Sequence, residues 1–188
     1  MQEYYDSVFE KEDYTQKPFP KGEYEQCRFV QCDFSAADFR DCKFVDCSFQ
    51  QCNLSLVNLT AVAFRGVRFS DCKLMGLRFE ACNPLGLAMH FERCQLNHST
   101  FYKLSLKKTV FRQCQLHEAD FTEADLSQAI LEGSDLAGAQ FSQTNLEKAD
   151  LRGAINYSLH PSQNRVNNAR FSMPEALRLL EAFGVVVE

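Results

Sequence analysis

The sequence predicts an all-β solenoid whose chain winds into four-sided coils. Two observations lead to this fold class: a large apolar residue returns at five-residue intervals, and a small residue stands two positions before it in most repeats. Five steps on an α-helix scatter side chains around the cylinder, and five steps on a flat strand alternate between its two faces. Neither element buries every repeat together, so the chain must turn once in each repeat.

The large apolar residue of each repeat, here named the centre, is Leu or an aromatic residue throughout. The centre and the small residue two positions before it point to the same side of an extended segment, so both are expected to face the core. The centres form two series separated by one break, namely Tyr24, Phe29, Phe34, Phe39, Phe44, Phe49, Leu54, Leu59, Phe64, Phe69, Leu74 and Phe79, and then Phe91, Leu96, Phe101, Leu106, Phe111, Leu116, Phe121, Leu126, Leu131, Leu136, Phe141, Leu146 and Leu151.

Four repeats close one square coil if each repeat turns the chain by roughly a right angle. A coil then has about twenty residues, and coils stack about 4.8 Å apart through parallel-strand hydrogen bonds. Rings of Phe and Leu fill the axis, and the small residues fill the space between them. The period leaves the handedness of the coil open.

Several repeats carry a three-residue motif that points to a family. Residues 119–121 (ADF), 124–126 (ADL), 134–136 (SDL) and 149–151 (ADL) match the consensus A-[DN]-L-x-x of the pentapeptide-repeat proteins. The chain resembles this family over residues 22–155. The resemblance implies a right-handed quadrilateral parallel β-helix, which a short C-terminal α-helix is expected to cap.

The chain divides into three parts. Residues 1–21 keep aromatic residues in phase with the centres, but Glu12 and Lys17 occupy small inward sites, so an irregular N-terminal cap is expected. Residues 22–171 are predicted to form the β-helix. Residues 172–188 are predicted to form a C-terminal helix and strand, which close the open end of the solenoid and serve as the dimerisation module.

Two segments interrupt the regular repeats. Near residues 83–90 the interval between centres is two residues longer than two repeats. Pro84 cannot donate to the ladder and Gly86 permits unusual backbone angles, which predicts a bulge or small loop. This loop is either an insertion without a role or a short contact loop. The last coil, residues 156–171, is expected to be less regular.

The C-terminal segment has helical signals. Ser172 and Glu175 have the spacing of a capping box, and Pro174 suits the first turn of a helix. An apolar stripe follows, Gly184 can end the helix, and Val185–Val187 is expected to form a strand. The tail can cover the solenoid only partly and can also pair with a second copy. The residues expected in these contacts are Met173, Leu177, Leu180, Phe183 and Val185.

Composition limits the class of protein. A net charge of −5 over 188 residues argues against direct binding to nucleic acid. No apolar run approaches membrane-spanning length and the first residues do not have the pattern of a signal peptide, so a cytoplasmic protein without membrane contact is expected. The nine cysteines stand at inward small sites and are expected to be buried and reduced, since zinc sites need clustered CxxC-like spacing.

The sequence offers little for catalysis. The four histidines are scattered without a carboxylate or thiol partner at a telling spacing, and no Gly-rich phosphate loop occurs. We therefore expect no catalytic residue, no cofactor and no metal, and do not expect an enzyme.

Charge is uneven in the second series of repeats. Residues 93–115 carry only basic charges, whereas residues 117–151 are strongly acidic. One interpretation is that outward positions simply have to be polar. The other is an acidic surface complementary to a DNA-binding groove on another protein. The candidate residues are Glu118, Asp120, Glu123, Asp125, Glu132, Asp135, Glu147 and Asp150.

The C-terminal sequence narrows the resemblance. Residues 156–164 and 171–188 are similar to the C-terminal module of the Qnr-type quinolone-resistance proteins and of the immunity protein against a gyrase-directed microcin. This resemblance implies a dimeric, DNA-mimicking rod that binds DNA gyrase or topoisomerase IV and protects it from quinolones or toxins. The alternative is an interaction scaffold whose protein partner is not a topoisomerase.

Overall fold

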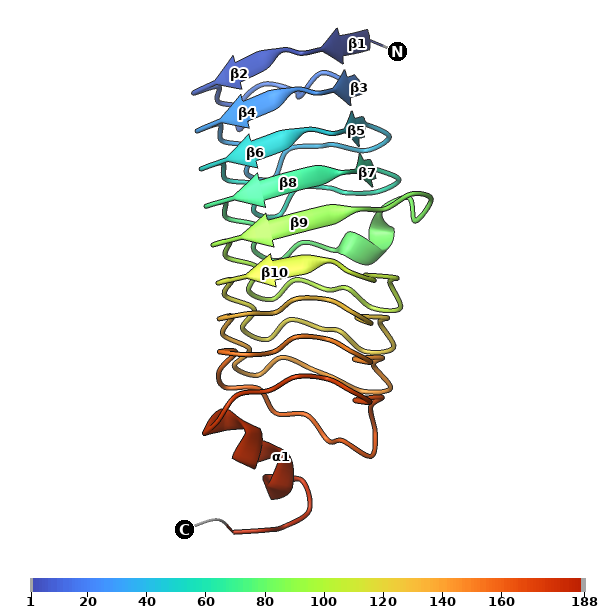
Figure 1. The fold of residues 1–188 in the computed structure, drawn as a ribbon. Helices are drawn as coiled ribbons and strands as arrows, with labels where there is room; N and C mark the ends of the chain where they lie inside the picture. The colour runs from blue at the N-terminus through green and yellow to red at the C-terminus, as the bar shows by residue number, and fades with distance from the viewer. Residues whose placement is uncertain (1, 187–188) are drawn as a thin grey trace.

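The computed structural model describes residues 2–186 and forms a solenoid of stacked parallel coils (Figure 1). Two adjacent faces carry β-sheets. The first face consists of β1 (Gln2–Tyr5), β3 (Gly22–Glu25), β5 (Lys43–Val45) and β7 (Ala63–Arg65). The second face consists of β2 (Val8–Glu10), β4 (Arg28–Val30), β6 (Ser48–Gln50), β8 (Val67–Ser70), β9 (Met89–Glu92) and β10 (Val110–Arg112).

The third and fourth faces are held by single parallel bridges. Asp33 pairs with Asn53 on the third face, and Asp38 pairs with Asn58 on the fourth. On the first face Tyr24 pairs with Phe44, again one coil of twenty residues further along the chain. The predicted four-sided parallel β-helix is therefore confirmed.

The core consists of the predicted centres stacked in columns. Phe29 lies over Phe49 with ring centroids 4.6 Å apart and nearly parallel planes, and the column continues through Phe69 and Phe91 to Phe111. Each of these rings is fully buried. Burial of one such side chain contributes about 1.5–3 kcal/mol, and offset stacking adds to this.

The corners are tight turns with one left-handed residue. The amide of Ala37 donates to the carbonyl oxygen of Phe34 across 2.8 Å, and Ala36 between them has φ +56°. This geometry corresponds to a type II turn, which needs a positive φ at its third residue. The second residue after each centre adopts it at most corners, so the five-residue period follows from one turn per repeat.

Several corners are open, and a polar side chain from the next coil closes them. The Cys72 thiol donates to the carbonyl oxygen of Phe49 across 3.4 Å, and its sulfur accepts from the amide of Cys52, also at 3.4 Å. The Ser134 hydroxyl bridges another corner in the same way. The inward cysteines are thus hydrogen-bonding groups as well as small apolar residues, a role that the sequence analysis missed.

All nine cysteines are buried free thiols, as expected for the inward small sites. Burial raises the pKa of the Cys47 and Cys82 thiols to about 12. A thiol with a raised pKa stays protonated at neutral pH, and the thiolate is the reactive form. These two cysteines are therefore structural and unreactive.

The N-terminal segment corrects one expectation. Residues 2–21 form a coil in register with the next one, since Gln2 pairs with Gly22 and Phe9 with Phe29. The polar residues Glu12 and Lys17 are tolerated because they lie in the end coil and form an ion pair of 2.7 Å with each other. The segment therefore continues the β-helix and is not an irregular cap.

The predicted loop occurs where the break predicts it. A 3-10 turn, η1 (Phe79–Ala81), precedes it, and Val67 pairs with Met89, a separation of 22 residues where other coils have 20. The chain leaves the first face at Asn83 and returns at Ala88, so the loop projects beside β9 (Figure 1).

The C-terminal module differs in detail from the prediction. It contains a 3-10 turn, η2 (Glu175–Leu177), and a helix, α1 (Arg178–Glu181). The expected capping box is not formed, because the Ser172 hydroxyl accepts from the amide of Gly153 in the solenoid. Val185 and Val186 are not in a strand, since no neighbouring strand is present to pair with them, and Val187 lies outside the described residues.

Candidate protein-binding surfaces

The outward side chains of the described residues form surfaces along the rod. No group of three or more His, Cys, Asp or Glu side chains in residues 2–186 is arranged to hold a metal ion. Within the same residues, no helix combines the length and apolarity that crossing a bilayer requires. The outward side chains are the residue before each centre and the two after it, so any recognition uses columns of these side chains along the rod.

The eight predicted acids lie on all four faces. A continuous acidic stripe would need acids from successive coils on one face, and the register does not provide this. The first face carries Asp125 and Glu147, the second Glu132 and Asp150, the third Glu118 and Asp135, and the fourth, with its corner, Asp120 and Glu123.

Most of these acids are paired with bases of the preceding coil. The basic segment and the acidic segment are consecutive coils, so their side chains meet one above the other. The pairs are His98–Glu118 (3.2 Å), Lys103–Glu123 (3.3 Å), Lys107–Asp125 (3.3 Å), Arg112–Glu132 (3.2 Å) and His117–Asp135 (2.8 Å), while Asp150 pairs with Arg152 at 2.6 Å. Within residues 2–186 only Asp120 and Glu147 of the eight lack such a partner.

Local hydrogen bonds hold several of these carboxylates in the charged form. Arg152 donates to Asp150 and is the main reason that the pKa of Asp150 is lowered. Burial alone would raise the pKa of Asp125, but hydrogen bonds from Ser127 and Lys107 outweigh it and lower the pKa. These carboxylates are therefore ionised at neutral pH and committed to neighbours within the rod.

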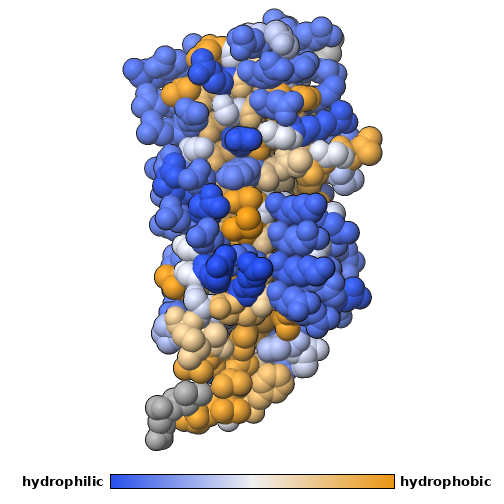
Figure 2. Space-filling model, viewed as in Figure 1, coloured by the Kyte–Doolittle hydropathy of each residue, from blue (hydrophilic) through white to orange (hydrophobic). Residues whose placement is uncertain are grey.

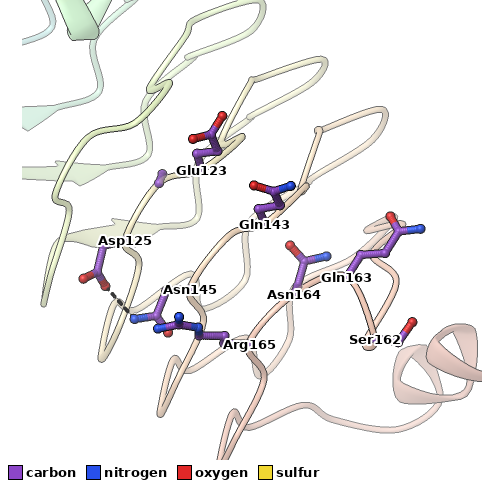
Figure 3. Close-up of a pocket in the computed structure, with 9 residues that line it drawn as sticks. Glu123, Asp125, Gln143, Asn145, Ser162, Gln163, Asn164 and Arg165 are labelled. Carbon is purple, nitrogen blue, oxygen red and sulfur yellow. Dashed lines mark hydrogen bonds between the residues drawn. The ribbon is translucent and has the colours of Figure 1, made fainter.

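A polar groove of about 520 Å³ lies at the corner between the fourth and first faces, and the sequence analysis did not foresee it. Figure 3 shows side chains from three successive coils lining it, including Glu123, Gln143 and Gln163. Asn145 donates to Asp125 across 3.1 Å on its floor. The sequence contains a signal for this groove, because Glu and Gln residues recur along it at intervals of one coil. The groove offers hydrogen bonds but no apolar anchor.

The loop near residues 83–90 presents one large apolar side chain. Leu85 is 72% exposed at the loop tip. The amide of Leu85 donates to the Asn83 side chain, and the amide of Leu87 donates to the carbonyl oxygen of Pro84, so the loop is closed by its own hydrogen bonds. Gly86 has φ +72°, which only glycine adopts without strain.

Apolar surface gathers at the C-terminal end of the molecule (Figure 2). Leu179 packs against the solenoid core, whereas the side chains predicted for cap or dimer contacts are mostly exposed. Leu177 is half-buried. The exposed ones are Met173 (67%), Leu180 (39%), Phe183 (58%) and Val185 (46%).

Comparisons with known proteins agree with this architecture. The solved structures include two trypsin-treated forms of QnrB1, described as a plasmid-mediated fluoroquinolone resistance protein. Both are 18% identical and match 100% of this chain: one has a TM-score of 0.69 over 100% of its own length, the other 0.74 over 92%. HetL, a pentapeptide repeat protein involved in heterocyst differentiation regulation from Nostoc, is 19% identical over 92% of this chain and 87% of its own, with a TM-score of 0.42.

Family models give the assignment. A comparison with curated protein sequences finds no match. The model for a pentapeptide repeat region matches residues 19–84 and 42–112, and the model for pentapeptide repeats matches eight copies over residues 114–153. The motif, the four-sided coils and these matches agree, and the chain belongs to the pentapeptide repeat family.

Proposed function

We propose that this protein is a non-catalytic rod that binds a type II DNA topoisomerase, DNA gyrase or topoisomerase IV, and modulates it or protects it from quinolones or toxins. The observation that supports this best is the likeness to QnrB1, a fluoroquinolone resistance protein, over the full length of both chains. The C-terminal sequence resembles the Qnr-type module independently of the repeats.

Mimicry of DNA by negative charge can use fewer acids than the eight that the sequence suggests. Paired acids present little net charge to a partner, because their bases lie within 4 Å. The unpaired residues Asp120 and Glu147 are the available acids of the predicted set. The N-terminal coils add acids without an ion pair in residues 2–186, namely Glu3, Asp6, Asp13, Glu25, Asp33, Asp41 and Asp46.

Binding through a dimer is part of the proposal. The exposed apolar side chains at the C-terminal end would be covered by the same end of a second copy, which places two rods end to end. Burial of this exposed apolar surface would be the driving force for association. Sedimentation of Leu180→Glu and Phe183→Glu variants checks this, and a monomeric wild-type protein at high concentration would contradict it.

DNA supercoiling by purified gyrase, titrated with this protein with and without a fluoroquinolone, tests the proposed partner. We expect inhibition or rescue near stoichiometric protein. An Asp120→Asn, Glu147→Gln double variant should weaken the effect more than the matched Glu123→Gln, Glu132→Gln variant, because Lys103 and Arg112 already neutralise the acids of the second pair. No effect at large excess would reject the topoisomerase.

The alternative is an interaction scaffold for another protein. The neutralised acidic coils favour it, because a surface whose charges are paired internally loses its likeness to DNA. Equal effects of the two double variants in the supercoiling assay would also favour it, since unspecific loss of charge would then explain the result.

A further inference from the structure

The middle of the rod carries a cluster of positive charge around the projecting loop. We name it the basic collar, and it consists of Arg65, Arg68, Lys107, Lys108 and Arg112. Arg65 and Arg68 lie in the coil before the loop and the other three in the coil after it, since β8 pairs with β9 and β9 with β10. The loop, residues 83–88, has no charged residue.

The collar retains net positive charge after internal pairing. Lys107 pairs with Asp125 and Arg112 with Glu132, which leaves five cations against two acids. Arg65, Arg68 and Lys108 form no ion pair within residues 2–186. Arg68 and Lys108 are exposed.

Arg65 joins the collar to the loop. Its Nε atom is buried and has no hydrogen-bond partner in residues 2–186. A Cβ on Gly86 would lie 3.4 Å from this atom, so the loop rests on the Arg65 side chain. His90 pairs with Arg68 in the parallel ladder, and burial followed by the charge of Arg68 lowers the pKa of His90.

The loop holds its apolar tip outward. Leu87 contacts the core, whereas Leu85 points away from it and is 72% exposed. The two hydrogen bonds within the loop limit the freedom of this turn, so little conformational entropy would be lost when Leu85 is buried by a partner.

The geometry points to a second interaction surface, formed by Leu85 and the basic collar, that binds a protein partner with an apolar pocket rimmed by carboxylates. An anchored apolar side chain with positive charges beside it has the form of an interface hot spot with a polar rim. A nucleic acid fits less well, because only Arg65, Arg68 and Lys108 of the collar lack an internal acid, whereas tight phosphate binding needs more free cations. This inference does not depend on topoisomerase binding.

Fluorescence anisotropy with three labelled probes tests this surface: a short peptide of Glu, Asp, Leu and Phe, the same peptide with Gln and Asn for the acids, and a short DNA duplex. The full-length protein should bind the acidic peptide about tenfold more tightly than the neutral one. High salt should remove this preference.

Matched variants locate the binding. Leu85→Asn and the Arg68→Gln, Lys108→Gln double variant should each weaken acidic-peptide binding about tenfold. Leu56→Asn, at a Leu of 67% exposure on another corner, and Arg28→Gln with Lys148→Gln should leave it unchanged. The inference would be overturned if both peptides bound equally well, or if the duplex bound more tightly through the same residues. An equal loss of binding in the control variants would also overturn it.

Discussion

The thiol of Cys72 donates a hydrogen bond to the carbonyl oxygen of Phe49, one coil earlier, across 3.4 Å. The same sulfur accepts from the amide of Cys52, so one side chain satisfies both ends of an open turn. The closed corner at Cys42 has no such bridge, because the Cys42 amide itself donates to the carbonyl oxygen of Phe39 at 2.9 Å. At several open turns the inward site one coil later thus holds a small hydrogen-bonding residue.

Cys72→Ala should therefore destabilise the protein. The change leaves the buried amide of Cys52 without its partner, at a cost of about 1–3 kcal/mol. Cys72→Ser should recover part of the loss, since Ser134 forms the same bridge. The midpoint of denaturant unfolding measures both. Cys42→Ala is the control, and an equal loss there would mean that volume rather than hydrogen bonding matters.

Substitution of Phe44 tests the core register. This ring is fully buried and stacks on Tyr24 at 5.1 Å and Phe64 at 5.5 Å. Phe44→Asp should abolish soluble folding, because an unpaired charge would lie in a ring of the core. Phe44→Leu should fold at a cost of about 1–2 kcal/mol. Soluble, folded Phe44→Asp protein in circular dichroism would refute the register.

Gly22 should be intolerant of a side chain. A Cβ at this position would lie 2.4 Å from the carbonyl oxygen of Gln2 in the first coil. Gly22→Ala should therefore separate β1 from β3 and lower the hydrogen-exchange protection of the first coil. Gly184→Ala, where nothing lies within 4 Å, should leave this protection intact. Unchanged protection in Gly22→Ala would show that β1 shifts without cost.

Low pH should lower the free energy of unfolding, because it protonates carboxylates that accept hydrogen bonds in the folded protein. The pKa of Asp150 is lowered chiefly by Arg152, so its contribution is complete above the ordinary value of about 4 and is lost as pH falls through the folded-state pKa. Asp150→Asn should reduce stability at pH 7 by no more than about 1 kcal/mol, since the Arg152 side chain is 58% exposed and solvent screens the pair. The difference in stability between Asp150→Asn and the wild type should shrink toward about pH 2–3, because Asp150 becomes protonated in this range. A constant difference between pH 7 and pH 3 would exclude this explanation.

The solenoid was predictable because its constraints are local. Phe44 and Cys42 are two residues apart, so both side chains point toward the axis, and each following repeat has the same spacing. The loop was predictable too, since Pro84 cannot donate to the ladder and the interval between centres is two residues too long there. The first coil could not be predicted, because the charged residues Glu12 and Lys17 occupy inward sites. Their ion pair, which the sequence does not reveal, makes these positions acceptable.

The sequence by itself determined the period, the inward positions and the family, because these depend on residues within one repeat. The tertiary structure decided which outward residues share a face and which charges cancel. Lys107 and Asp125 meet at 3.3 Å although 18 residues separate them, a contact that depends on how each coil closes. The acidic segment is conspicuous along the chain, yet Lys103, Lys107 and Arg112 of the coil above it each neutralise one of its acids in space.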